Sequence, residues 1–206
     1  MGIGEDIKSV YIDVGVSYNI LRDDEEISGE YCVYKINRQV TKPFIQEFFL
    51  EAQLPHDTQL VPGDLLEFQT DKRVFMLMNK NPTMFEDEIV NYQGILYKCN
   101  VSGELFTPSG EIWDSQTYHK VTVWKQKKAV CYGLQTEPLF GHDLETDEEL
   151  GQIGIERHQF FVPHSVGIET LDRYEPVSGE YYKVEEIKRR RFPGVDVVEL
   201  SEDTRE

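Results

Sequence analysis

Charged residues are concentrated in two short stretches of the chain, and these are the side chains best suited to binding a partner. Ammonium and guanidinium groups pair with carboxylates and phosphates. We therefore expect both stretches at or near contacts with partner molecules, although lysine and arginine on an exposed strand edge also prevent stray strand pairing. The basic stretch is Lys188, Arg189, Arg190 and Arg191, and the acidic stretch contains Asp143, Glu145, Asp147, Glu148 and Glu149.

The sequence contains no constellation of residues typical of catalysis. There is no glycine-rich phosphate loop, no nucleophile elbow and no His-Glu-x-x-His pair. His142, His158 and His164 have acidic neighbours and are the candidate metal ligands, but no ligand spacing recurs among them. Some pair of the 38 carboxylates will lie close together in almost any fold, so they do not indicate a hydrolase. We expect no enzyme activity, no bound metal and no cofactor.

The chain is strongly acidic and rich in aromatic residues. Its 206 residues carry a formal net charge of −17, and 12% of them are aromatic. The charge repels phosphate at long range, which excludes strong nonspecific binding to DNA or to an anionic membrane. The aromatic content favours strands and argues against wholesale disorder. An acidic surface supplies solubility, and it also suits a passage along which nucleic acid slides without sticking.

The cysteines and the N-terminus indicate a cytoplasmic protein. Cys32, Cys99 and Cys131 are odd in number and widely spaced, so we expect free thiols in a reducing compartment. The start of the chain is acidic and lacks the long apolar core of a secretory signal. No apolar run approaches the roughly 18 residues that cross a bilayer, so we expect no membrane contact.

Residues 61–100 have the most regular pattern of the chain and predict a compact β-meander. Pro62-Gly63-Asp64 is a turn signal before a short apolar strand. The apolar run 74–78 is as long as a buried strand and too short for a buried helix. Asn81-Pro82 is expected to end that strand, and Gln93-Gly94 to separate two further strands.

Other strand candidates lie on both sides of the meander. Pro193-Gly194 fits the two central positions of a type II turn, so residues 181–200 predict a C-terminal β-hairpin. Turns are expected at Pro108-Ser109-Gly110 and over the basic residues 125–128. The remaining candidates are residues 10–20 with a bulge at Gly15, 31–36, 101–107, 118–124, 129–132, 159–162 and 166–174.

Two segments differ from the predicted series of strands: one fits either a helix or a strand, and the other is expected to be a loop. Residues 41–54 have apolar side chains at helical spacing, but they also fit an extended strand, which the β-rich surroundings favour. Residues 140–154 predict a solvated acidic loop. The sequence therefore predicts an all-β fold with short helices at most. We expect a single compact barrel or sandwich-like domain over residues 1–206, with 140–154 as a loop insertion.

Three blocks of the sequence share a pattern of strands and turns with a known family. In them Gly63-Asp64 opens a strand, Tyr97-Lys98-Cys99-Asn100 ends a later one, and a hairpin closes the chain. Together they resemble the small β-rich neck proteins of tailed bacteriophages, of the head-closure (stopper) or head-tail adaptor type. The blocks are GEYCVYKINRQVTKPFIQEFFLEAQLPHDTQ (29–59), the segment from VPGDLLEFQTDKRVFML to ILYKCN (61–100), and YYKVEEIKRRRFPGVDVVELSEDTR (181–205).

The resemblance implies a non-enzymatic structural protein of the phage virion, made in the host cytoplasm. Such a protein forms a homo-oligomeric ring at the head–tail junction and connects the portal or adaptor to the tail or tail-terminator protein. The ring surrounds the DNA channel without sequence-specific binding, and an acidic channel does not retain passing phosphates. The basic run of one subunit can then meet the acidic loop of its neighbour, and residues 140–176 are insertions relative to the family.

Three other functions remain open from the sequence. The first is another β-module of the virion, such as a tail-completion or baseplate protein. The second is a small all-β carbohydrate-active hydrolase, in which Trp113 and Trp124 supply a platform for a sugar; otherwise both tryptophans pack in the core or at an interface. The third is an acidic DNA mimic, which requires carboxylates spaced like phosphates, whereas this chain clusters them in loops.

Overall fold

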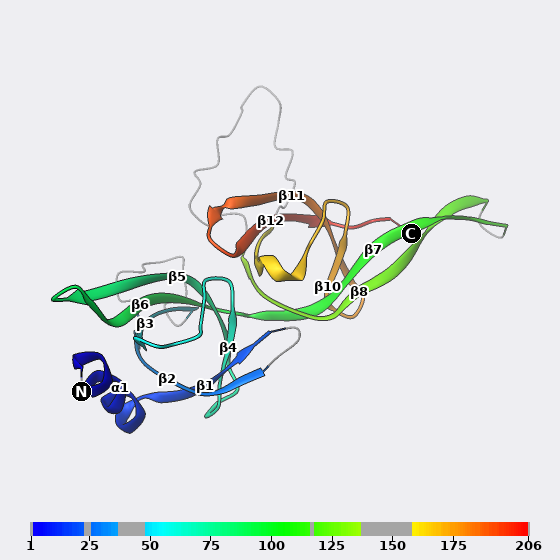
Figure 1. Cartoon of the computed structure of the whole chain (residues 1–206). Helices are drawn as coiled ribbons and strands as arrows, with labels where there is room; N and C mark the ends of the chain where they lie inside the picture. Colours follow the sequence, from blue (N-terminus) through cyan, green and yellow to red (C-terminus); the bar gives the residue numbers. More distant parts are fainter. Residues whose placement is uncertain (1, 23–25, 37–47, 116–117, 137–157, 206) are drawn as a thin grey trace, which may run out of the picture. The chain divides into compact units, whose positions relative to one another are not determined.

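Figure 1 shows the computed structural model of the chain, which describes residues 2–22, 26–36, 48–115, 118–136 and 158–205. Of these described residues 69% are in strands, with one α-helix among them, so the fold is mainly β and the predicted all-β class is confirmed. The single domain expected over residues 1–206 is organised as two compact units. The first unit contains residues 1–99, 163–165 and 189–195, and the second contains residues 100–162, 166–188 and 196–206.

Six antiparallel strands of the first unit form a closed barrel, in the order β1-β2-β3-β6-β5-β4. The barrel closes because β4 pairs with β1, which places Tyr18 opposite Phe68. Closure leaves the barrel itself without an open strand edge. The strands are β1 (Val16–Leu21), β2 (Glu26–Ile36), β3 (Phe49–Pro55), β4 (Leu65–Phe68), β5 (Val74–Phe85) and β6 (Glu88–Lys98).

Large side chains fill the core of this barrel. Tyr18, Phe68 and Phe75 are fully buried, and the ring centroids of the two phenylalanines lie 5.1 Å apart. Each such side chain stabilises the fold by roughly 1.5–3 kcal/mol because it leaves water. The Tyr18 hydroxyl lies 3.2 Å from Oγ1 of Thr58, so its polar end is hydrogen-bonded inside the core. Burial raises the pKa of Tyr18 and keeps the phenol neutral.

The helix α1 (Ile3–Val14) corrects one prediction. We expected a strand over residues 10–20, but the chain is helical as far as Val14, and the strand β1 begins only at Val16. Glu5 and Asp6 lie in the first turn of the helix, where negative charge is favourable. The β-branched residues of this segment favoured a strand, but tertiary packing outweighs that preference.

Tyr11 attaches α1 to the first barrel. Its side chain is buried, together with Gly4 two turns earlier on the same face of the helix. Its hydroxyl accepts a hydrogen bond from Nδ2 of Asn91 at 3.0 Å and donates one to Oε1 of Gln53 at 3.3 Å. The residues that it contacts therefore belong to β6 and β3, which neighbour each other in the barrel.

The second unit also contains a closed barrel of six strands, in the order β7-β8-β9-β12-β11-β10. The two barrels share one topology: in each, two three-stranded meanders join through their first strands and through their third strands. The strands are β7 (Val101–Asp114), β8 (His119–Thr136), β9 (His158–Pro163), β10 (Arg173–Val177), β11 (Glu180–Phe192) and β12 (Val195–Glu202), and the short 3-10 helix η2 (His164–Val166) follows β9.

The core of the second barrel has its own aromatic stack. Phe160 of β9 and Tyr174 of β10 are fully buried, with ring centroids 4.5 Å apart. The predicted strand 159–162 is confirmed as part of β9. The prediction of a strand over residues 166–174 was wrong, because Val166 ends η2 and β10 begins only at Arg173.

The hairpin of β5 and β6 is longer than the sequence indicated. We expected breaks at Asn81-Pro82 and Gln93-Gly94, but both strands run through these positions and pair as far as Phe85 opposite Glu88. The turn is made by Glu86 and Asp87, whose φ angles are 47° and 66°. The two predicted strand breaks were wrong because proline and glycine are tolerated in a strand at an edge or beside a bulge.

The hairpin of β7 and β8 is longer still. The turn predicted at Pro108-Ser109-Gly110 is a β-bulge within β7, since the register shifts between Pro108 and Gly110 and the pairing continues to Asp114. The basic residues 125–128 lie in the middle of β8 rather than in a turn. Lysine-rich segments suit an exposed ribbon as well as a turn, so composition did not separate the two.

Three further predictions concern residues 41–54, the C-terminal hairpin and the acidic loop. Residues 49–54 belong to the strand β3, so the extended interpretation is confirmed there, whereas residues 41–47 lie outside the described part. The strands β11 and β12 meet at Pro193-Gly194, where the terminal hairpin was predicted. The acidic loop 140–154 also lies outside the described residues.

Within the first unit, two glycines bring two turns into backbone contact. Gly63 has a φ of 92° and Gly194 a φ of 70°, which are conformations that L side chains rarely adopt. A Cβ atom on Gly63 would lie 2.1 Å from the carbonyl oxygen of Gly194. The contact therefore requires glycine both for its conformation and for its missing side chain.

We predict that Gly63→Ala destabilises the protein by about 3 kcal/mol, because it adds a steric overlap to the cost of the positive φ. Gly29→Ala is the matched control, since Gly29 has a φ of 86° and no atom within 4 Å of the added Cβ. This control should lose only about 1 kcal/mol. Urea unfolding followed by circular dichroism measures both values, and equal losses would contradict a close approach at Gly63.

Candidate functional site

The basic run lies on the second half of β11, and its four side chains are exposed. Successive residues of a strand point to opposite faces, so Lys188 and Arg190 share one face and Arg189 and Arg191 share the other. Lys188 donates a hydrogen bond to Glu199 of β12, and this bond raises the pKa of the lysine. The guanidinium carbon of Arg191 lies 5.6 Å from the ring centroid of Phe192.

The structure therefore keeps the four cations on one strand and exposed to solvent. The carboxylates expected to accompany them, Asp143, Glu145, Asp147, Glu148 and Glu149, lie outside the described residues, as does His142. The prediction that these acids lie near contacts stays a prediction. The basic run remains a surface that can pair with carboxylates or phosphates of another molecule.

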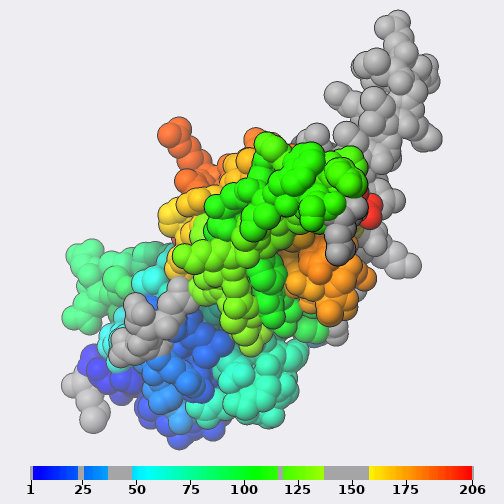
Figure 2. Space-filling view, turned by 90° about the vertical axis from the view of Figure 1, so that its right-hand side faces the viewer, coloured from blue at the N-terminus to red at the C-terminus, as the bar shows by residue number. Residues whose placement is uncertain are grey.

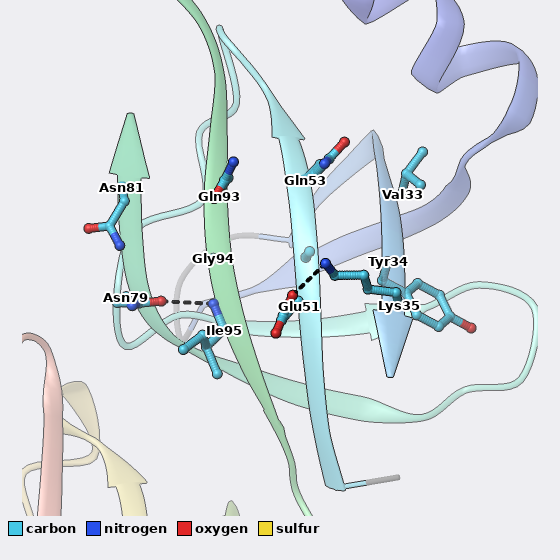
Figure 3. Close-up of a pocket in the computed structure, with 11 residues that line it drawn as sticks. Val33, Tyr34, Lys35, Glu51, Gln53, Asn79, Asn81, Gln93, Gly94 and Ile95 are labelled. Atoms are coloured by element: carbon cyan, nitrogen blue, oxygen red, sulfur yellow. Dashed lines mark hydrogen bonds and ion pairs between the residues drawn. The ribbon is translucent and has the colours of Figure 1, made fainter. Parts of the chain in front are cut away.

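A polar groove of about 390 Å³ lies on the first barrel and was not predicted from the sequence. Figure 3 shows its lining side chains on four adjacent strands, β2, β3, β6 and β5. The strand register aligns them in two rows across these strands. One row is Val33, Gln53, Gln93 and Asn81, and the other is Lys35, Glu51, Ile95 and Asn79.

Hydrogen bonds and one ion pair already occupy part of the groove. Lys35 Nζ lies 2.8 Å from Oε2 of Glu51, and Oδ1 of Asn79 accepts a hydrogen bond from the backbone N–H of Ile95 at 2.8 Å. The lining contains amides but no serine, cysteine or histidine. It can donate and accept hydrogen bonds, and its titratable groups are Tyr34, Lys35 and Glu51, of which the last two are paired with each other. The groove is suited to contact with another chain.

The groove could be anticipated only in part. Asn79 and Asn81 alternate along one strand, and this spacing places polar side chains on one face of a sheet. The sequence assigned a strand break to this segment, however, so the alternation was not used. Which strands lie beside each other depends on the barrel topology, and no local pattern reveals it.

The cysteines and histidines do not form a reactive centre in the part of the chain that the structure describes. Cys32 and Cys131 are buried, and burial raises the pKa of Cys32 to about 12, so that this thiol is unreactive near neutral pH. His158 packs edge-on against Tyr182, with ring centroids 5.2 Å apart. Within the described ranges, no group of three or more histidine, cysteine, aspartate or glutamate side chains could hold a metal ion.

A cluster of cations and one aromatic ring fixes the C-terminal segment within the second unit. Nε of Arg173 lies 2.7 Å from Oδ2 of Asp203, and Nε of Arg205 lies 2.8 Å from its Oδ1. The guanidinium carbons of these arginines lie 3.9 Å and 4.8 Å from the ring centroid of Trp124. The carboxylate of Asp203 is fully buried, so it is a paired internal charge.

The two tryptophans, which were candidates for a sugar platform, lie in different environments. The ring of Trp124 has arginine side chains against it, so it is not an open platform for a sugar. Trp113 is 61% exposed and lies on the β7–β8 hairpin. Sequence reasoning missed the cluster because its members, on β8, β10 and the last residues, are distant in the chain.

We predict that Asp203→Asn destabilises the protein at neutral pH by about 3 kcal/mol, because it leaves Arg173 without its buried counter-charge. Burial disfavours the charged carboxylate, but the hydrogen bonds from Arg205 and Arg173 outweigh it and lower the pKa of Asp203 to about 2. A folded-state pKa below the unfolded one means that this stabilisation is complete above about pH 4 and is lost as the pH falls toward 2.

Urea unfolding at pH 7 and at pH 2.5 measures this effect. The difference between the wild-type protein and Asp203→Asn should shrink at the lower pH. Asp71→Asn is the control, since the Asp71–Arg73 pair is partly exposed and contributes only about 0–1 kcal/mol. An equal difference at both pH values would show that the carboxylate charge is not the stabilising feature.

Comparisons with known proteins give no match: no family model, no curated protein and no solved structure matches this chain. Among the described residues, no helix is long and apolar enough to cross a membrane. The basic run on β11 and the polar groove on the first barrel are therefore the candidate functional surfaces, and both are suited to contacts with other macromolecules.

Proposed function

We propose that this chain is a structural protein of a tailed-phage virion. It forms an oligomeric ring at the head–tail junction, connects the portal or adaptor to the tail, and surrounds the DNA channel. The observation that carries the proposal is the exposed basic run at residues 188–191 on a strand of a chain with a net charge of −17. The run presents two exposed cations on each face of this strand, and such cations are suited to recognising an acidic protein surface, including that of a second copy.

The resemblance to head-closure and adaptor proteins supports the proposal. Gly63-Asp64 directly precedes β4, and Tyr97-Lys98 ends β6, which agrees with the strand-and-turn pattern of that family. The third block, residues 181–205, covers nearly all of β11 and the whole of β12, and the basic run lies in the second half of β11. A role in assembly also agrees with a groove in which the lysine and the glutamate are paired with each other and the other polar side chains are mostly amides.

The net charge supports a position beside DNA without tight binding. Phosphates passing through a ring of acidic subunits are repelled, so they do not remain attached to the wall. The acidic protein would contact DNA without sequence preference, and its specific contacts would be with the portal or adaptor, with the tail or tail-terminator protein, and with itself.

Another β-module of the virion, such as a tail-completion or baseplate protein, is the second candidate. It uses the same kind of exposed basic surface and differs in the neighbour that it binds. A carbohydrate-active hydrolase is less well supported, because the ring of Trp124 is packed against two arginines.

We predict that the purified protein forms a closed ring, or that it binds portal particles from its source in a fixed copy number. Native mass spectrometry or mass photometry, with and without portal particles, measures both. Arg189→Glu with Arg190→Glu should weaken the binding about tenfold or more, since a rim charge of the wrong sign repels an acidic partner.

The matched control is Lys8→Glu with Lys72→Glu, which changes the net charge equally on side chains of the first unit outside the basic run. A monomeric protein that ignores portal particles would refute the proposed function. Binding to tail or baseplate particles alone would favour the second candidate.

A further inference from the structure

The hairpin of β5 and β6 continues beyond the first barrel (Figure 1). In residues 83–90, which we call the hairpin arm, the two strands pair only with each other. The reason is that β3 reaches no further along β6 than Asn91, and β4 no further along β5 than Met76. In Figure 2 the atoms of this arm, coloured between cyan and green, stand out at the left of the view. Its strand edges have no neighbouring strand in the described chain, so they are accessible to another molecule.

The hairpin arm is acidic and carries exposed apolar side chains. Glu86, Asp87 and Glu88 are all exposed, and residues 81–97 contain no lysine, arginine or histidine. Met84 is 54% exposed and Phe85 is 49% exposed beside these acids. The arm therefore presents three carboxylates and two large apolar side chains, with no cation on its own strands to neutralise them.

The first unit also contains a segment of opposite charge. Residues 189–195 belong to this unit and contain three arginines and no carboxylate. The arginines are Arg189, Arg190 and Arg191 of the basic run; all three are exposed, and we call them the arginine segment. Lys188 is left out because it is paired with Glu199. Guanidinium groups bind carboxylates and stack on aromatic rings, so this segment matches both the acids and the phenylalanine of the hairpin arm.

The hairpin arm and the arginine segment lie toward opposite ends of β6. The arm contains the first residues of β6, beginning at Glu88. Burial raises the pKa of Tyr97, and the positive charge of Arg191 opposes this rise, so Arg191 lies near the last residues of β6. Glu88 and Tyr97 are about 30 Å apart along the strand, at roughly 3.3 Å per residue. The arm and the arginines are both exposed, so neither covers the other within one chain.

From this arrangement we infer that the hairpin arm of one copy binds the arginine segment of the next copy. Three carboxylates then face three guanidinium groups, and the partner that carries the matching charge is a second copy of this chain. Two arms repel each other, and so do two arginine segments, so like surfaces are excluded from pairing. The contact joins two different surfaces, and such contacts repeat around a ring or along a filament.

The inference deepens the proposed function, because it names the acidic surface that the basic run binds. It rests on that proposal only for the place of the ring in a virion. It assigns this role to the hairpin arm rather than to the acidic residues 143–149, and substitutions in each segment distinguish the two.

The test uses two variants of the full chain, each with reversed charge on one surface. One is Glu86→Lys with Glu88→Lys, in which Asp87 is kept because aspartate tolerates its φ of 66°. The other is Arg189→Glu with Arg190→Glu. Each variant alone should assemble only at a concentration at least about tenfold higher than the wild-type protein, because like charges then meet across the contact. Mixing the two should restore assembly, since each surface again finds a complementary one. Mass photometry over a dilution series measures all samples.

Two variants control for net charge. Glu180→Lys with Glu202→Lys, on exposed residues of the second unit, changes the net charge by the same amount as the arm variant. Lys8→Glu with Lys72→Glu does the same for the arginine variant and changes side chains outside both surfaces. Both controls should assemble like the wild-type protein. Loss of assembly in either would attribute the effect to net charge and would overturn the inference.

A second pair of variants tests the apolar part of the contact. Phe85→Ser should weaken assembly about tenfold, because an aromatic side chain is lost from the contact. Trp113→Ser is the matched control, since Trp113 is 61% exposed and belongs to the second unit. It should assemble normally, and circular dichroism should show an unchanged fold for both variants. An equal loss in both would indicate nonspecific apolar association and would overturn the inference.

The remaining outcomes separate the inference from its rival and from the proposed function. Loss of assembly in Glu145→Lys with Glu148→Lys, while the arm variant assembles normally, would make the acidic stretch the partner and overturn the inference. A wild-type protein that stays monomeric, or a mixture that fails to restore assembly, would also overturn it. Portal binding by a protein whose arm variant assembles normally would overturn the inference and leave the proposed function standing. Assembly through this contact into open filaments that ignore portal and tail particles would support the inference and refute the proposed ring.

Discussion

Barrel closure is the constraint on which the rest of this structure depends. In the first unit β1 must pair with β4 and β3 with β6, and in the second β7 must pair with β10 and β9 with β12. These pairs join strands that are distant in the chain, so closure fixes the register of whole meanders at once. A closed barrel hides its edges. In the described residues, the β5–β6 and β7–β8 hairpins continue beyond the residues that pair with β3 and β10.

The sequence predicted what depends on local alternation. The apolar run at 74–78 became the buried start of β5, and residues 159–162 became part of β9, because a short apolar run between breaks has few other solutions. Pro193-Gly194 was identified as a turn for the same reason, since proline and glycine fix the backbone locally. The all-β class and the basic run on a strand near the end of the chain followed from these local patterns.

What the sequence did not predict depends on contacts between distant residues. Residues 10–14 are helical because Tyr11 packs against β6 and β3, which no local preference reveals. Pro108 and Pro82 were interpreted as strand ends, although an exposed hairpin tolerates them. The groove requires four strands in one order, and the buried Asp203 requires two arginines that are 30 and 2 residues away. Such sites emerge only once the topology is known.

The interleaving of the two units has a consequence for synthesis on the ribosome. The first unit includes residues 189–195, and Gly194 contacts the turn at Gly63. The N-terminal strands therefore emerge long before the segment that completes their unit has been translated. Neither unit is a contiguous piece of the chain, but the six strands of the first barrel all lie within residues 16–98, so this barrel can close before β11 and β12 are translated. The contact between Gly194 and the turn at Gly63 is added to the first barrel only later, after the segment 189–195 has left the ribosome.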